Sequence, residues 1–440
     1  MAIGVCMAAI VQTATLLHLT ASCALGCAIG KYSSHMHTAR YHGLDFLRAS
    51  MMLLGVVLHV VSSYIEAPAA GGWPLRDPNG SGFAGLVVLT IHVFRMPAFF
   101  ALSGFFGAIV VARRGMGAWL ADRVRRIAFP MVVAWIVLFP MTKLAFTYAL
   151  GRAAEATGAS GASVPLIGTA LSRPWAEPSP IHLWFLLYLL ALSAIAAALW
   201  AASRALPADA RRRIAELPAR WISGWRGIVS IALLALATTL PMCAMDRPGI
   251  ATPSSFALDR AVLACYAVYF FGGWMIAQHP RAIDALRAGA WWRLSAGVFA
   301  LVVSVVLAIA WFVGAGSTQP ADGPVMRILL FATQSSGAVA AWLLILGGAG
   351  VAERAVRASS RPLRVLVDSS YWVYLVHLPI CVLVTGLLIP WSAPGLVKMV
   401  VAITGSVLLL ALGYAATLAV LPRRVRPEPC LQPEVRTLPQ

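Results

Sequence analysis

Charged side chains are scarce in this sequence: only 11% of its 440 residues are Asp, Glu, Lys or Arg, whereas 60% are hydrophobic. Its mean hydropathy is +0.81. A soluble chain of this length would form two or three domains with charged surfaces, and the composition excludes that class. The sequence therefore predicts a polytopic membrane protein whose helices place their apolar faces in lipid.

Acidic residues are the scarcest of the charged types, with 16 Asp and Glu against 34 Lys and Arg, so the formal net charge is +18. In a soluble protein such an excess would suggest a nucleic-acid partner. Here the arginines gather in short segments between apolar runs, which is the pattern of a lipid bilayer partner. We expect no nucleic-acid binding.

The sequence also lacks the cysteine spacings of metal and disulfide sites. No CxxC pair occurs, and no cysteine has a metal-like spacing to a histidine. Six of the seven cysteines lie in or beside apolar runs, where cysteine serves as a small apolar filler. We therefore expect no metal site. The cysteines are Cys6, Cys23, Cys27, Cys243, Cys265, Cys381 and Cys430.

Long apolar runs, by contrast, are abundant, and a membrane-spanning helix needs about 20 mainly apolar residues. Ten such runs predict an all-α membrane domain of ten transmembrane helices within 40–422, followed by a cytoplasmic tail, 423–440. The predicted spans are 44–65, 84–111, 128–150, 181–203, 227–245, 258–278, 292–314, 325–350, 369–390 and 395–420.

The connections between these spans alternate in charge. Arginine-rich segments follow the second, fourth, sixth, eighth and tenth spans, and the other connections carry only scattered cations. Positively charged loops face the cytoplasm, so both ends of the ten-span unit are predicted to be cytoplasmic.

The apolar N-terminal segment, 1–39, lacks the basic region of a secretory signal. Two interpretations stay open. The segment forms an extra span with an outside N-terminus, or translation begins at Met36 and leaves the short cytoplasmic leader MHTARYHGLDFLR.

The first predicted span contains RASMMLLGVVLH, with an arginine and a histidine at its two ends. The eleven residues from Arg48 to His59 turn a helix by about 1,100°, so both side chains point the same way, roughly 16 Å apart along the axis. Asp45 can pair with Arg48 across one turn. Because ionisable groups are costly in hydrocarbon, this stripe is expected to face a protein interior or a water-filled path.

The second span contains TIHVFRMPAFFALSGFF, in which His92 and Arg95 are one turn apart and Pro97 follows. An arginine at that depth needs an anion or a polar cavity. The fourth span opens with HLWFLLYLL, which includes His182, Trp184 and Tyr188. The ninth opens with DSSYWVYLVHLP, where Asp368 or Ser369 fits a helix N-cap and His377 lies about two turns inside.

Five motifs occur along the chain in the order LDFLRASMMLLGVVLH, FRMPAFFALSGFF, WLADRVRRIAFP, HLWFL and SSYWVYLVHLP. In that order, on a ten-span chain, they resemble the membrane acyltransferase-3 family, and within it the glucans biosynthesis protein C branch. The resemblance covers about residues 40–420.

The resemblance implies an O-acyltransferase of the inner (plasma) membrane. Such an enzyme transfers a succinyl or acetyl group from cytoplasmic acyl-CoA, its donor substrate, to a hydroxyl of a periplasmic or cell-envelope glycan. No permanently bound cofactor is implied.

The family's Arg-x10-His signature falls on Arg48 and His59, and His59 would act as general base, since an unperturbed histidine has a pKa of about 6.5. The other expected roles follow from charge and position. The residues expected at the CoA phosphates are Arg48, Asp45, Arg123, Arg125 and Arg126. Those expected to stabilise the oxyanion or hold the acceptor are His92, Arg95 and His377. Those expected to bind the acceptor are His182, Trp184 and Tyr374.

A second class of function stays open from the residues alone. Buried histidine and arginine also suit a proton-coupled secondary transporter of a polar or anionic substrate. The sequence shows no inverted repeat and no matched pair of interrupted helices, which counts against a transporter.

Overall fold

The computed structural model describes residues 41–66, 73–158, 172–173, 175–207, 209, 224–279, 281–316, 323–358 and 360–420. The apolar N-terminal segment and the cytoplasmic tail predicted from the sequence lie outside this range. Within it, secondary structure is helical apart from one isolated bridge between Ile65 and Ser81. The prediction of an all-α fold is confirmed for these residues.

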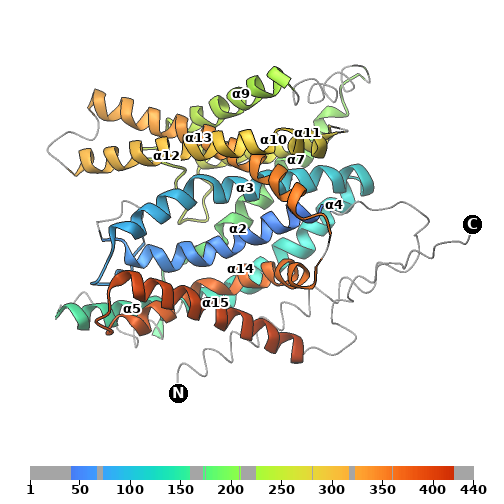
Figure 1. Cartoon of the computed structure of the whole chain (residues 1–440). Coiled ribbons are helices and arrows are strands. Elements are labelled where there is room, and N and C mark those ends of the chain that lie inside the picture. The colour runs from blue at the N-terminus through green and yellow to red at the C-terminus, as the bar shows by residue number, and fades with distance from the viewer. Residues whose placement is uncertain are drawn as a thin grey trace, which may run out of the picture.

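The helices lie side by side as a bundle (Figure 1). In chain order they are α2 (His42–Val61), η1 (Ser62–Tyr64), α3 (Gly82–Arg114), α4 (Met116–Arg123), η2 (Val124–Ala128), α5 (Phe129–Thr157), η3 (Ile181–Leu183), α7 (Trp184–Ser203), α9 (Gly224–Met242), α10 (Arg260–Ala277), α11 (Ala282–Ala288), α12 (Ala290–Ala315), α13 (Pro324–Ala355), α14 (Arg361–Leu388) and α15 (Gly395–Val420).

Nine of the ten predicted spans correspond to helices that are long and apolar enough to cross a membrane, counted over the described residues. The predicted span 227–245 corresponds to α9, whose apolar part, Gly227–Met242, is shorter than the others. The structure therefore supports a polytopic membrane protein, with nine clear spans in the described part of the chain.

Two helix boundaries differ from the sequence prediction. The ninth span begins at Arg361, where the Ser360 side chain accepts the backbone N–H of Leu363, so the N-cap predicted at Asp368 or Ser369 is wrong. The basic segment after the second span is helical as well, since α4 and the π-helix η2 run directly into α5. Hydropathy marks where a helix can lie in lipid, and it misses the polar turns that extend the helix beyond that depth.

Helix α14 is the most enclosed helix of the bundle. Within its most apolar window 78% of residues are buried, against 28–50% for the other eight long helices in the described chain. It packs against α2, α5 and α15, and α13 packs against α2, α3, α9 and α12. The apolar part of α14 therefore faces protein on most of its surface.

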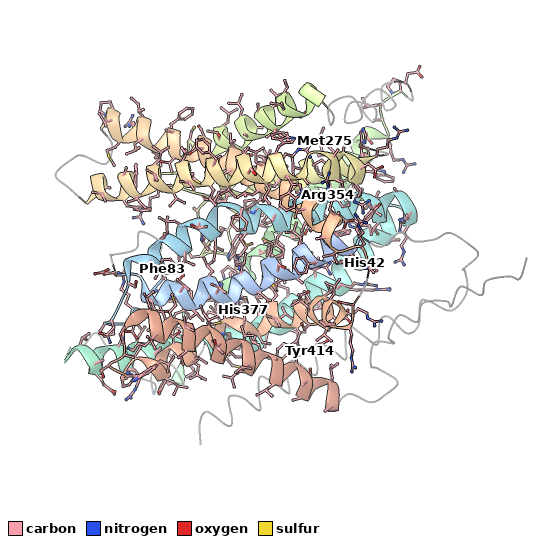
Figure 2. The ribbon with its side chains drawn as sticks, viewed as in Figure 1. His42, Phe83, Met275, Arg354, His377 and Tyr414 are labelled. Atoms are coloured by element: carbon pink, nitrogen blue, oxygen red, sulfur yellow. The ribbon has the colours of Figure 1, made fainter. Side chains whose placement is uncertain are left out.

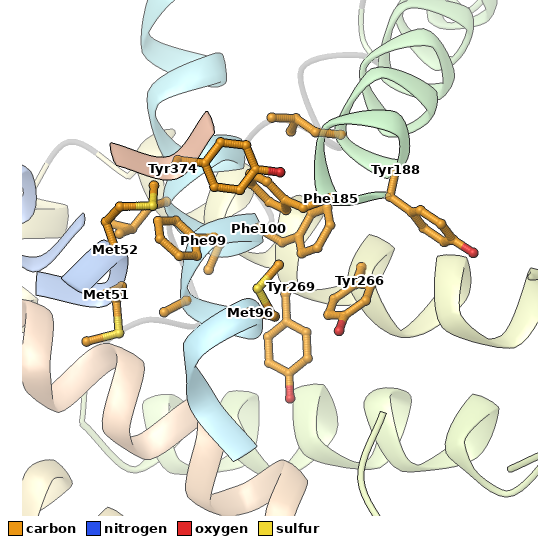
Figure 3. Close-up of a cluster of buried hydrophobic side chains, with 14 of the residues drawn as sticks. Met51, Met52, Met96, Phe99, Phe100, Phe185, Tyr188, Tyr266, Tyr269 and Tyr374 are labelled. Atoms are coloured by element: carbon orange, nitrogen blue, oxygen red, sulfur yellow. The ribbon is translucent and has the colours of Figure 1, made fainter. Parts of the chain in front are cut away.

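Helices α3 and α10 cross at backbone contact distance. A Cβ at Gly104 would collide with the Phe270 carbonyl, and a Cβ at Gly273 would collide with the Ala101 carbonyl. Small residues allow this close approach in membrane helices. Aromatic rings surround the crossing (Figure 3), where Phe100 stacks on Tyr266 at 4.2 Å between centroids.

The two ends of the bundle are distinct in Figure 2, which shows His42 and Arg354 at one end, Phe83 at the other and His377 between them. Among the described residues, the arginine-rich connections after the second, sixth and eighth spans lie at the end with His42. We call it the inner end, because the charge pattern predicts that this end faces the cytoplasm. The end with Phe83 is the outer end.

Candidate active site

Three histidines from distant parts of the chain meet toward the outer end. The ring of His377 on α14 lies 5.1 Å from that of His59 on α2 and 5.0 Å from that of His182 on η3, measured between centroids. His59 occupies the last turn of α2. At about 1.5 Å per residue it lies roughly 26 Å along the axis from the inner end of that helix. The predicted ionisable stripe of α2 therefore ends at a histidine cluster.

The hydrogen bonds of His377 fix which of its nitrogens carries the proton. Its Nδ1 lies 2.7 Å from the Tyr374 carbonyl oxygen and 3.1 Å from that of Val373. Carbonyl oxygens only accept, so Nδ1–H donates and the neutral ring keeps a lone pair on Nε2. The side chain is 3% exposed, and Nε2 is buried without a hydrogen-bond partner. The cluster thus contains a bare proton acceptor.

His182 repeats this arrangement with its nitrogens exchanged. Its Nε2 donates to the Leu375 carbonyl at 3.0 Å, and its buried Nδ1 has no hydrogen-bond partner. Tyr374 donates its hydroxyl proton to the His182 carbonyl at 2.9 Å. These two bonds tie η3 to α14, so His182 and His377 form one rigid unit.

Arg95 of α3 enters the same space across Gly55 of α2. A Cβ at Gly55 would collide with Arg95 Nη1 and would lie 3.9 Å from His377 Nε2. The absence of a side chain at Gly55 therefore makes room for the guanidinium beside the bare nitrogen.

Arg95 lacks an anionic partner in the described part of the chain. Its recorded hydrogen bond is a weak one, from Nη2 to Met96 Sδ at 3.3 Å, and none of the ion pairs between described residues includes it. A cation at this depth is stable when an anion or a polar ligand receives it. The site is thus suited to a ligand that carries or develops negative charge.

An outer connector, residues 73–81, covers His59. Trp73 stacks on the His59 ring at 5.3 Å between centroids and donates its Nε1–H to Ser63 Oγ at 2.9 Å. The side chains of His59 and Trp73 are both half-buried, so the connector covers the histidine without enclosing it fully.

A buried ion pair holds this connector in place. Lys398 of α15 contacts Asp77 at 2.8 Å, with both side chains at 0% exposure, and also donates to the Ile389 carbonyl. A buried pair is costly to break from one side. The connector and its tryptophan are therefore fixed against the helix bundle.

Two further predicted site residues, His92 and Trp184, have other partners. His92 is exposed, with Nε2 3.3 Å from the Thr252 hydroxyl, and Trp184 packs against Tyr188 and Tyr266 in the aromatic core. Neither makes a recorded ring contact with His59, His182 or His377.

The residues predicted to contact the CoA phosphates lie at the inner end. Arg48 is 3.5 Å from Asp45, as its spacing predicted, and its side chain is 40% exposed. Arg123 lies over the Trp119 ring at 5.0 Å, and its Nε has no hydrogen-bond partner. Arg125 and Arg126 are exposed. Their predicted role stays a prediction.

Sequence reasoning missed Gly55, Trp73 and the Lys398–Asp77 pair. Gly55 lies between Arg48 and His59, one turn before the histidine. A glycine at that position was a signal that another helix comes close to the helix face that carries Arg48 and His59. Trp73 and the ion pair gave no such signal, because their partners are distant in sequence.

The cluster can perform acid–base chemistry next to a charge-stabilising group. A bare imidazole nitrogen can accept a proton from a hydroxyl, and a guanidinium can donate to an oxyanion that forms nearby. Acyl transfer to a hydroxyl needs these two functions.

Comparison with known proteins agrees with this chemistry. A family model described as "Acyltransferase domain" matches residues 41–420. Proteins named glucans biosynthesis protein C from Escherichia coli strains K12, SMS-3-5 and O1:K1 / APEC are each 31% identical over 156 residues. That match covers 36% of this chain and 38% of each relative. No solved structure matches the chain.

Proposed function

The chain belongs to this acyltransferase family, and on that premise we propose that it is a membrane O-acyltransferase acting across the bilayer. The proposed donor is acyl-CoA supplied at the inner end, with succinyl or acetyl as the acyl group. The proposed acceptor is a hydroxyl of a glycan at the outer end, in the inner membrane of the cell. The glucan in the printed name of the relatives supports that class of acceptor.

One observation carries the proposal: the guanidinium of Arg95, without a recorded anionic partner, lies beside the bare Nε2 of His377 and in the same cluster as His59. A charge-stabilising donor so close to proton-accepting nitrogens supports the proposal. A proton-coupled transporter would also use such groups, but it would need no cation cluster for CoA at the inner end, where Arg48, Arg123 and Arg126 lie.

In the proposed reaction His59 accepts the proton of the acceptor hydroxyl. The hydroxyl oxygen attacks the thioester carbonyl and forms a tetrahedral oxyanion, to which Arg95 donates hydrogen bonds. Collapse of this intermediate breaks the carbon–sulfur bond. The protonated His59 returns its proton to the leaving thiolate, so the products are an ester and free CoA.

His377 supports His59 in this proposal without contacting the acyl group. Its Nδ1–H is held by the Tyr374 carbonyl, so Nε2 stays available to accept a hydrogen bond from the neighbouring imidazole. A base oriented by a third group is the arrangement of other acyl-transfer enzymes. The stacked Trp73 ring would help to hold the orientation of the His59 ring.

Mass spectrometry of envelope glycans tests the proposal. A deletion strain should lose one acyl modification, a plasmid copy of the wild-type chain should restore it, and a His59→Ala copy should not. Identical glycans in the deletion and wild-type strains would contradict the proposal.

A further inference from the structure

A cavity of about 400 Å³ opens at the inner end of the bundle, far from the histidine cluster. It is lined by His42, Arg287, Glu353, Arg354, Val356 and Arg357, which come from α2, α11, and α13 with the residues that follow it. His42 and Arg354 mark its position in Figure 2. None of these residues belongs to the proposed reaction.

Two glycines bring the three segments together. A Cβ at Gly43 of α2 would collide with the Ala352 and Glu353 backbone of α13. A Cβ at Gly350 of α13 would collide with the Leu286 carbonyl of α11. The cavity is therefore built by close backbone packing, and its walls come from the fold.

The one carboxylate in the cavity wall is already engaged. Glu353 Oε1 accepts the Leu44 backbone N–H at 2.9 Å, which caps the first turn of α2, and Oε2 lies 3.2 Å from Arg287 Nη2. The Glu353 side chain is 4% exposed. It neutralises one of the three arginines, so the positive charges of the other two remain on the wall.

The two other arginines have no acid to pair with among the described residues. Neither Arg354 nor Arg357 takes part in an ion pair recorded there. Arg357 Nε donates to the Arg354 backbone carbonyl at 3.2 Å, which holds its guanidinium at the cavity. A simple lipid-facing arginine would need no cavity around it, whereas guanidinium groups around a concave surface suit phosphate oxygens.

We propose that this inner cavity binds a phosphate-bearing anion through Arg354 and Arg357. The ligand chemistry is a phosphate ester presented at the inner membrane surface. The phosphate belongs to one of two sources, a phosphorylated nucleotide or an anionic lipid headgroup. In both cases the guanidinium groups would donate hydrogen bonds to phosphate oxygens. The nucleotide source rests on the acyl-CoA donor proposed above, and the lipid source does not.

Binding by the purified full-length protein in detergent tests the pocket. The nucleotide probe is adenosine 3′,5′-bisphosphate, followed by calorimetry. The lipid probe is phosphatidylglycerol, followed by the number of lipid molecules retained in native mass spectrometry. Neither probe carries an acyl group for transfer, so the result is independent of the proposed reaction.

The variant is the pair Arg354→Gln and Arg357→Gln, and the matched control is Arg361→Gln, an exposed arginine at the same end that does not line the cavity. Losing one charge-assisted contact costs about tenfold in affinity or more, so the pair should weaken binding by about 10²-fold. The control should bind like the wild type.

Weakened nucleotide binding in the double variant identifies a nucleotide pocket, and selective loss of retained phosphatidylglycerol identifies a headgroup pocket. Both outcomes support the proposal. It is overturned if the double variant binds both probes as the wild type does, or if the wild type binds neither.

Discussion

Replacing Gly55 by alanine should disable the site while leaving the fold in place. The added Cβ would occupy the position of Arg95 Nη1 and lie 3.9 Å from His377 Nε2. Arg95 must then move, because the backbone of α2 is held on both sides by packed helices. The substitution therefore displaces the cation from the bare nitrogen without touching either side chain.

The two expected costs differ in size. The colliding atom is the end of a flexible side chain, so the fold should lose about 1 kcal/mol, at the low end of overpacking penalties. Losing one donor to a developing oxyanion costs about 10²–10³-fold in rate, or about 2.7–4 kcal/mol of barrier. Activity should fall far more than stability.

The assay is acyl transfer per unit of membrane-inserted protein, with thermal unfolding in detergent as the stability readout. Gly405→Ala on α15 is the mild control, since its Cβ would rest at an ordinary 3.6 Å from a Val384 methyl group. Gly104→Ala is the severe control, because its Cβ meets the backbone of α10. The first should keep both properties and the second should lose both. Normal transfer in Gly55→Ala would refute the role given to Arg95.

Three further substitutions test other parts of the account. His59→Gln keeps hydrogen bonding without a titratable proton, so transfer should fall by about 10²–10⁴-fold; near-normal transfer would leave His377 as the base. Arg48→Lys keeps the charge and loses the planar fork, so it should raise the apparent KM for acyl-CoA with insertion intact; an unchanged KM in membrane vesicles would make Arg48 a headgroup anchor. Lys398→Met leaves the charge of Asp77 buried without a partner, so it should cost about 3–5 kcal/mol of stability, and adding Asp77→Asn should recover part of that loss. Equal melting temperatures of the wild type and Lys398→Met would contradict the role of this ion pair in holding residues 73–81.

The sequence was sufficient for the class of fold and for part of the residue cluster that forms the candidate site. Apolar runs of membrane length predicted the helices, because a spanning helix must satisfy its own backbone and shield it with apolar side chains. Burial cost then singled out His59, Arg95 and His377 as groups that need a protein environment. The structure brings these three together around Gly55.

The rest of the site depends on contacts that no local pattern contains. Trp73 reaches His59 because Lys398, more than 300 residues away, holds the connector that carries it. His92 lies one turn from Arg95 on α3, so the pattern places the two on the same side of the helix. The His92 side chain nevertheless contacts Thr252, in the segment between α9 and α10. Helical periodicity gives the face of a residue, and only packing between helices decides what that face meets.

Inside-out membrane vesicles provide the most direct test of acyl transfer across the bilayer. Their outer surface exposes the inner end, so radiolabelled succinyl-CoA or acetyl-CoA can be added there while the glycan acceptor stays in the lumen. With the wild-type chain, the account predicts labelled glycan that resists added glycosidase until detergent opens the vesicles, and none with His59→Ala. Absence of labelled glycan with both donors, or equal labelling in the two chains, would contradict it.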